Sequence, residues 1–339
     1  MRPHASVAAL VAAFACAAGT SAQTSTRYTL DPAGEWKAGA APVPGSDEAI
    51  IAQARKDLAE DRPTAALSAM NTWLEKNERS KSALLPLAYI TRGDARTASG
   101  DEFEALYDYE AVVKQFAGQP EFITASEREL EIAVRYVNGM DRKSFGLRWI
   151  SADDIGTELL IRIQERLPGS QLAERAGIEL ADYYYRESDM ELASEAYELF
   201  LLNYPQSPYR MKAMQRRIYS SLARFKGPRY DGSPLTDSRV LIRRFSSLYP
   251  AQAQQAGLDE ALLTRIDESA GAQMMESARY YFDRGDLVAA RYTLNRLLAA
   301  HPQTAAAGRA VDVMRERGWL AKPADANAPE PAPVPEAAP

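Results

Sequence analysis

The pattern of apolar and polar positions is clearest in two stretches, residues 181–207 and 278–304, which lie 97 residues apart. In both, a small residue is followed by aromatic residues, a polar turn, an alanine, an aliphatic segment and a proline. The apolar positions recur at spacings of three and four, the period of one helix face. Each stretch therefore predicts two helices packed against each other. The equivalent positions that carry this structure are Ala181 and Ala278, Tyr184 and Tyr281, Ala193 and Ala290, and Pro205 and Pro302.

The residue types at these positions explain the predicted hairpin of helices. The small side chain of Ala181 lets the second helix approach closely, and Asp189 in the turn is expected to cap that second helix. Pro205 cannot continue a helix and ends the unit. This order is that of a tetratricopeptide repeat. One such unit cannot bury its apolar face alone, so several must stack.

The predicted fold is all-α, a right-handed superhelical array of about five to six helix pairs plus a capping helix. Predicted pairs are residues 48–60 with 63–77, 81–99 with 102–116, 127–138 with 153–166, 171–187 with 190–203, 208–224 with 236–248, and 258–284 with 287–300, with the cap at 305–317. Two connections, residues 139–151 and 226–234, are longer than a repeat turn requires.

A second signature marks the joins between units. A proline is followed two residues later by Ser170, Ser207 or Thr304, and eight residues later by an alanine. We expect each hydroxyl to cap the incoming helix.

Outside the array, residues 1–22 have the features of a secretory leader with a short apolar stretch. Two endings are open: cleavage before Gln23, or cleavage after residue 15 with lipidation of Cys16 in a sequence that resembles a lipobox. Residues 23–46 predict a flexible arm, residues 47–319 the array, and residues 320–339 a disordered tail rich in proline and alanine. The protein is expected to be exported to the periplasm.

Composition argues against several classes of chemistry. Cys16 is the only cysteine, and the two histidines are His4 and His301, so no cysteine or histidine site for a metal or nucleophile is expected. The net charge of −6 argues against a nucleic-acid binder. We expect no enzyme, no metal and no cofactor. Asp153 and Asp154 fit a helix start and Asp231 fits a turn.

Charge is unevenly distributed along the chain. Residues 205–245 contain ten Lys or Arg and two Asp, a net charge of +8, whereas residues 101–131 contain nine Asp or Glu and two Lys or Arg, a net charge of −7. These charges fit either solvated helix faces or a polarised array that orients on an acidic partner. The candidate partner-binding residues are Arg210, Arg216, Arg217, Arg224, Lys226, Arg229, Tyr230, Arg243 and Arg244.

The sequence of residues 182–209 resembles the BamD-like family of outer-membrane protein assembly factors, because its first predicted helix is rich in aromatic residues and its end reads Tyr-Pro-Gln-Ser-Pro-Tyr. The resemblance is clearest over residues 171–318. It implies a tetratricopeptide-like lipoprotein of the outer membrane, anchored through Cys16. It also implies docking onto the periplasmic domains of a barrel-assembly protein and delivery of unfolded outer-membrane proteins.

Three functional hypotheses follow. The first is a scaffold for assembly of outer-membrane β-barrel proteins. The second is a periplasmic scaffold for cell-wall or envelope maintenance, because similar repeats occur in coordinators related to YbgF. The third is an envelope enzyme with a carboxylate site.

Overall fold

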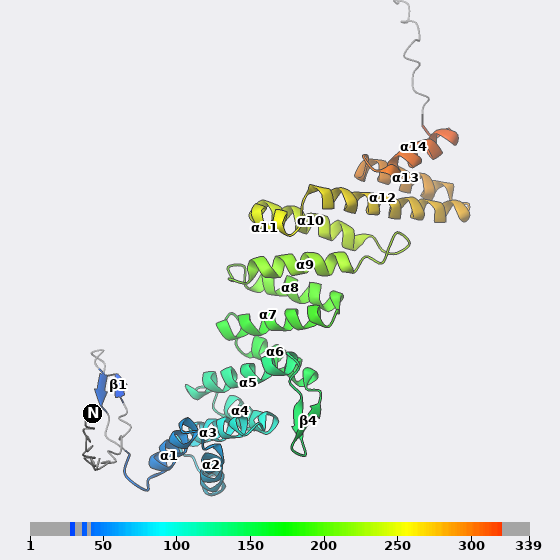
Figure 1. Cartoon of the computed structure of the whole chain (residues 1–339). Helices are drawn as coiled ribbons and strands as arrows, with labels where there is room; N and C mark the ends of the chain where they lie inside the picture. Colours follow the sequence, from blue (N-terminus) through cyan, green and yellow to red (C-terminus); the bar gives the residue numbers. More distant parts are fainter. Residues whose placement is uncertain (1–27, 31–35, 39–41, 321–339) are drawn as a thin grey trace, which may run out of the picture. The chain divides into compact units, whose positions relative to one another are not determined.

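The computed structural model describes residues 28–30, 36–38 and 42–320. The predicted leader with Cys16, most of the predicted arm and all but the first residue of the predicted tail lie outside the described residues. The chain forms two compact units, residues 1–99 and residues 100–339. Figure 1 shows their helices and strands.

The first unit contains two short strands and three helices. They are β1 Tyr28–Leu30, β2 Trp36–Ala38, α1 Asp47–Ala59, α2 Pro63–Asn77 and α3 Leu85–Ala98. The strands pair antiparallel, and the three helices pack on one another. The indole N–H of Trp73 donates to Asp47 at 2.8 Å, which joins α2 to the start of α1.

The second unit contains eleven helices and one hairpin within its described residues. They are α4 Glu102–Gln115, α5 Glu121–Val137, β3 Arg142–Ser144, β4 Leu147–Ile150, α6 Asp153–Arg166, α7 Gln171–Arg186, α8 Met190–Asn203, α9 Arg210–Ala223, α10 Ser233–Leu248, α11 Pro250–Gln255, α12 Glu260–Asp283, α13 Leu287–Ala300 and α14 Ala305–Glu316. Most helices pack on the next helix in the sequence, and α12 packs on α10, α13 and α14. The predicted all-α array of helix pairs is confirmed.

Successive apolar clusters form the core of this unit. One cluster joins α7, α8 and α9 around Ala181, Ala193, Tyr197 and Phe200. Ala181, Ala193, Ala278 and Ala290 are fully buried, Tyr184 and Tyr281 are partly buried, and Pro205 and Pro302 are exposed just after α8 and α13. A larger side chain at these alanines would have to displace the facing helix, because packed interiors have little free volume.

The two repeated stretches make the same turn with different residues. Ser188 has a φ of 63° and Gly285 a φ of 76°, the left-handed conformation that costs glycine least. The following aspartates then cap the next helix: Asp189 accepts from Leu192 N at 3.1 Å, and Asp286 accepts from Ala289 N at 2.9 Å.

The hydroxyls at the joins behave less uniformly than predicted. Ser170 and Thr304 accept a hydrogen bond from the first turn of α7 and α14. Ser207 instead accepts from Tyr209 N, and α9 begins one residue later with Tyr209 at its N-cap. The proline at position 208 has no N–H to offer, so the chain forms a tight turn before the helix starts.

Two connections differ from their predicted form. Residues 142–150 form the β3–β4 hairpin, where the sequence predicted only a connection of unusual length. The loop predicted at 226–234 ends earlier, because α10 begins at Ser233 and Pro234 is buried within its first turn.

Candidate protein-interaction surface

The residues predicted to contact a partner lie on α9, on α10 and on the loop between them. Arg210, Arg216 and Arg217 belong to α9, and Arg224 is its C-cap. Lys226, Arg229 and Tyr230 lie in the loop, and Arg243 and Arg244 are exposed on α10. Ala213, Met214 and Ile218 fill the buried face of α9, and the basic residues of this helix are partly buried beside that face.

Three of these arginines line one hollow of about 340 Å³ formed by α8, α9 and α10. Arg210 and Arg217 come from α9, and Arg244 comes from α10. The apolar part of the lining consists of Leu201, Leu202, Pro205, Met214 and Leu241. We name this hollow the arginine groove. Its apolar lining and its cations suit an amphipathic segment that carries a carboxylate.

Arg217 is the most firmly positioned cation of the arginine groove. Its Nη2 lies 2.8 Å from Glu198 Oε2, and its side chain is only 20% exposed, against 60% for Glu198. Its Nε is buried and has no acceptor among the described residues. A guanidinium has five N–H donors, so Arg217 keeps donor capacity beyond this one ion pair.

Arg216 lies apart from the arginine groove, in a network that joins three helices. Its Nη1 contacts Asp182 Oδ1 at 2.6 Å, and the same oxygen accepts from the hydroxyl of Tyr197 at 2.6 Å. Lys212 contacts the other oxygen of Asp182, and the Arg216 guanidinium lies over the Tyr185 ring. Burial and the nearby Asp182 raise the pKa of Tyr197, which keeps its hydroxyl a donor. Arg216 therefore ties α9 to α7 and α8.

The loop residues line three other hollows. Arg224, Lys226 and Tyr230 line the first together with the turn between α7 and α8. Arg229 lines the second, which faces Tyr280 of α12. Lys226, Arg229 and Tyr230 line the third. Arg243 lines neither the arginine groove nor any of these three hollows.

Asp231 has a structural task in the same loop. It accepts hydrogen bonds from the hydroxyl and the backbone N–H of Ser233, and these bonds lower the pKa of Asp231. This aspartate shapes the turn into α10.

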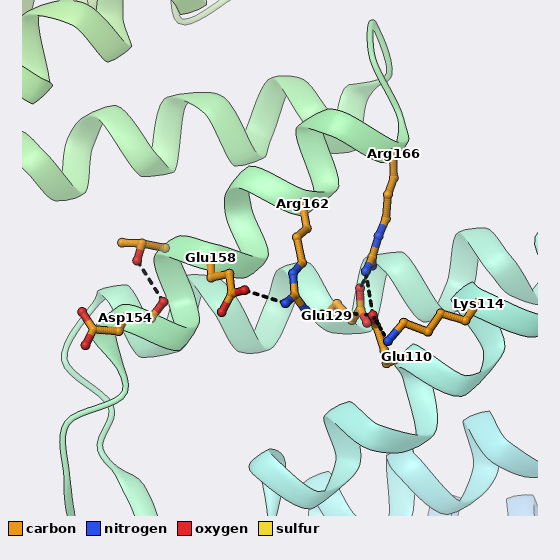
Figure 2. A network of polar contacts seen from close by, with 8 residues as sticks. Glu110, Lys114, Glu129, Asp154, Glu158, Arg162 and Arg166 are labelled. Carbon is orange, nitrogen blue, oxygen red and sulfur yellow. Dashed lines mark hydrogen bonds and ion pairs between the residues drawn. The ribbon is translucent and has the colours of Figure 1, made fainter.

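Part of the acidic segment of α4 and α5 is neutralised inside the protein. Figure 2 shows Arg166 of α6 between Glu110 of α4 and Glu129 of α5. Its Nη2 donates to both oxygens of Glu110, at 2.9 and 2.8 Å, and its Nη1 donates to Glu129 at 2.8 Å. Glu102, also buried, accepts two hydrogen bonds from Arg148 at 2.8 Å. Some of the carboxylates behind the net charge of −7 thus join helices inside the protein and are not available on its surface.

Glu110 and Glu129 have opposite protonation preferences. Burial, reinforced by the neighbouring Glu110, raises the pKa of Glu129 to about 8. Burial acts against ionisation of Glu110 too, but hydrogen bonds from Glu129, Lys114 and Arg166 lower its pKa to about 2. At neutral pH the pair holds one proton and one negative charge beside Arg166.

The aspartates at positions 153 and 154 lie in the first turn of α6, where acidic side chains complement the helix dipole. Figure 2 shows Asp154, whose backbone oxygen accepts from Thr157. Over the described residues, no group of three or more His, Cys, Asp or Glu side chains could hold a metal ion.

A comparison with known protein families identifies the family of this chain. The family model YfiO, described as outer membrane lipoprotein, matches residues 156–327. The chain belongs to the YfiO family. The match includes α7–α14 and therefore the whole arginine groove. Membership of the YfiO family makes this an exported, envelope-associated protein, and no described helix is long and apolar enough to cross a membrane.

Two further comparisons add little to the YfiO assignment. A solved structure, the C-terminal part of a TPR repeat-containing protein from Cytophaga hutchinsonii, is 15% identical, with a TM-score of 0.39. The alignment covers 79% of this chain and 88% of that chain. No curated protein matches the chain.

Sequence reasoning missed two features of this YfiO-family chain. The Glu110–Glu129–Arg166 cluster joins three helices, so its residues lie far apart in the sequence and no short motif indicates the contact. The β3–β4 hairpin had a local signal, because Ser-Phe-Gly-Leu places a glycine in a tight turn between residues typical of strands.

Proposed function

We propose that this chain is a scaffold of the outer membrane that acts by protein–protein interaction in the assembly of β-barrel proteins. Its partner is the periplasmic part of a barrel-assembly protein, and unfolded outer-membrane proteins are its clients. Membership of the YfiO family and an array of helix pairs support a role in interaction rather than in catalysis.

The observation that carries this proposal is the arginine groove. A groove that binds a partner segment needs apolar area for affinity and fixed charges for register and encounter rate. Leu201, Met214 and Leu241 supply the apolar area, and Arg210 and Arg244 supply cations. The complementary partner surface is a segment with apolar side chains and at least one carboxylate.

The test measures association of the full chain with the immobilised periplasmic domains of a barrel-assembly protein. The variant carries Arg210→Glu and Arg244→Glu, which reverse charges of the arginine groove without touching the Arg217–Glu198 pair. The expected result is an on-rate about tenfold lower at low salt, with the difference shrinking as salt screens the charges.

The matched control carries Arg309→Glu and Arg315→Glu, which make the same change in net charge on exposed positions of α14. If both variants associate like the unmodified chain, the arginine groove is not the docking surface. If the unmodified chain does not associate, barrel assembly is the wrong process, and a scaffold of envelope maintenance takes its place.

A further inference from the structure

The β3–β4 hairpin presents three large apolar side chains to solvent. Phe145 is 98% exposed, Leu147 70% and Trp149 63%. Phe145 is the most exposed large apolar side chain in the described part of the chain. The three lie within five residues of one another at the tip and on β4, and the hairpin projects from the stacked helices of its unit.

The base of the hairpin is fixed to α4 by side-chain contacts. These contacts hold the hairpin in the orientation that exposes its tip. Arg148 donates to both carboxylate oxygens of Glu102, and Lys143 lies 3.0 Å from Asp101. The guanidinium of Arg142 lies 4.2 Å from the centre of the Phe103 ring. Basic side chains thus hold the strands against α4, while the apolar side chains are left without cover.

The turn carries a residue that turn geometry alone does not favour. Phe145 and Gly146 both have positive φ, 49° and 82°, as in a two-residue hairpin turn whose first position favours Asn, Asp or Gly. A bulky residue in the left-handed region is uncommon and costs conformational energy. The register also shifts beside Arg142, and such irregularities re-aim neighbouring side chains. Strained positions of this kind cluster at functional sites.

We propose that the β3–β4 hairpin inserts Phe145, Leu147 and Trp149 into the headgroup–acyl boundary of a phospholipid bilayer. This contact lies beyond the proposed scaffold role and orients the second unit on the membrane surface.

Two observations favour a bilayer over a protein pocket. The indole N–H of Trp149 already donates to Ser144 O at 3.2 Å, so the ring enters an apolar layer without an unpaired donor. The chain also belongs to a family of outer membrane lipoproteins, for which a membrane is the adjacent surface. Tryptophan is enriched at membrane–water interfaces, where its ring lies at the level of the headgroups.

The test measures flotation of the full chain with vesicles of phosphatidylethanolamine and phosphatidylglycerol. All proteins carry Cys16→Ser, so no acyl chain at that position contributes. The hairpin variant carries Phe145→Asn, Leu147→Thr and Trp149→Thr, replacements that keep the turn and strand preferences. The control carries Val240→Gln, Leu248→Gln and Val288→Gln at other exposed apolar positions. The expected result is vesicle binding at least about tenfold weaker for the hairpin variant only.

A second measurement locates the contact. Brominated acyl chains should quench the fluorescence of Trp149, and Trp149→Phe should bind vesicles nearly as well without that quenching. Phe145→Asn alone should weaken binding while melting at the same or a higher temperature, which separates loss of contact from loss of fold.

The outcomes are distinct from those for the arginine groove. Retained vesicle binding by Arg210→Glu with Arg244→Glu, together with its loss in the hairpin variant, supports the membrane contact. No binding by the unmodified hairpin, or equal binding by the hairpin variant, overturns it.

Discussion

Arg166 at the end of α6 donates two hydrogen bonds to Glu110 of α4, at 2.9 and 2.8 Å. The same guanidinium reaches Glu129 of α5 at 2.8 Å, so one side chain joins three helices. Glu129 is fully buried, and its Oε1 has no hydrogen-bond partner in the described structure, so a proton on this carboxyl avoids a buried negative charge. The state of that proton should therefore govern the stability of this part of the array.

The first prediction concerns pH. Burial raises the pKa of Glu129 from 4.5 to about 8 in the folded protein. Between these values the folded state keeps a proton that the unfolded chain releases, so the free energy of unfolding falls as pH rises, by up to about 1.4 kcal/mol per pH unit. Glu129→Gln imitates the protonated side chain and should flatten this decline in denaturant melts between about pH 5 and about pH 8.

The control for this measurement is Glu131→Gln, an exposed position on the same helix. It should keep the pH dependence of the unmodified chain. Glu110 does not contribute in this window: its folded pKa is lowered to about 2, so its stabilising effect is complete above 4.5 and is lost only as pH falls toward 2. Parallel curves for the unmodified chain and Glu129→Gln would contradict the assignment.

Much of the fold could be predicted because the residues that define each repeat lie close together in the sequence. Ala181, Asp189 and Pro205 lie within one helix pair, so their spacing alone predicts close packing, a cap and a stop. The arginine groove was only partly predictable. Arg210, Arg217 and Arg244 were singled out as part of a basic segment, but Arg216, adjacent to Arg217, faces Asp182 instead. Which face an arginine takes depends on carboxylates brought by other helices, and that information is not local.

The second prediction uses the two copies of the repeat as controls for each other. Ser188 occupies the left-handed position that Gly285 occupies in the second copy. Ser188→Gly should raise the free energy of unfolding by about 0.5–1 kcal/mol, and Gly285→Ser should lower it by a similar amount, because only glycine adopts this conformation without a steric penalty. Denaturant melts measure both. Ser188→Ala should give no gain, and a gain from it would mean that φ is not the cause.

The third prediction concerns anchoring at Cys16, which lies outside the described residues. If Cys16 is the lipidated first residue, Cys16→Ser in a chain that also carries Phe145→Asn, Leu147→Thr and Trp149→Thr should move the protein from the membrane pellet to the soluble fraction after a high-salt wash, whereas the chain with these three hairpin changes and an intact Cys16 should stay in the pellet. A covalent lipid binds through buried methylene groups, which salt does not weaken, whereas electrostatic contacts are screened. Native protein that begins at Gln23 without a lipid would rule this anchor out.

The fourth prediction concerns the loop between α9 and α10. Lys226, Arg229 and Tyr230 line a hollow that shares no lining residue with the arginine groove, and Tyr230 is 60% exposed. Replacing all three with Ser should change the free energy of unfolding by less than about 0.5 kcal/mol per site, because exposed side chains away from caps contribute little to stability. The turn held by Asp231 and the buried Pro234 stay in place.

The same loop variant should weaken capture of the barrel-assembly protein's periplasmic domains, since exposed loops with aromatic and basic residues are suited to contact. The matched control replaces Tyr292, Arg309 and Arg315 with Ser, an exposed aromatic and two exposed arginines on α13 and α14. Reduced capture by the loop variant alone extends the docking surface from the arginine groove to the loop. Equal capture by both variants would confine docking to the groove, because the loop would then contribute neither to folding nor to recognition.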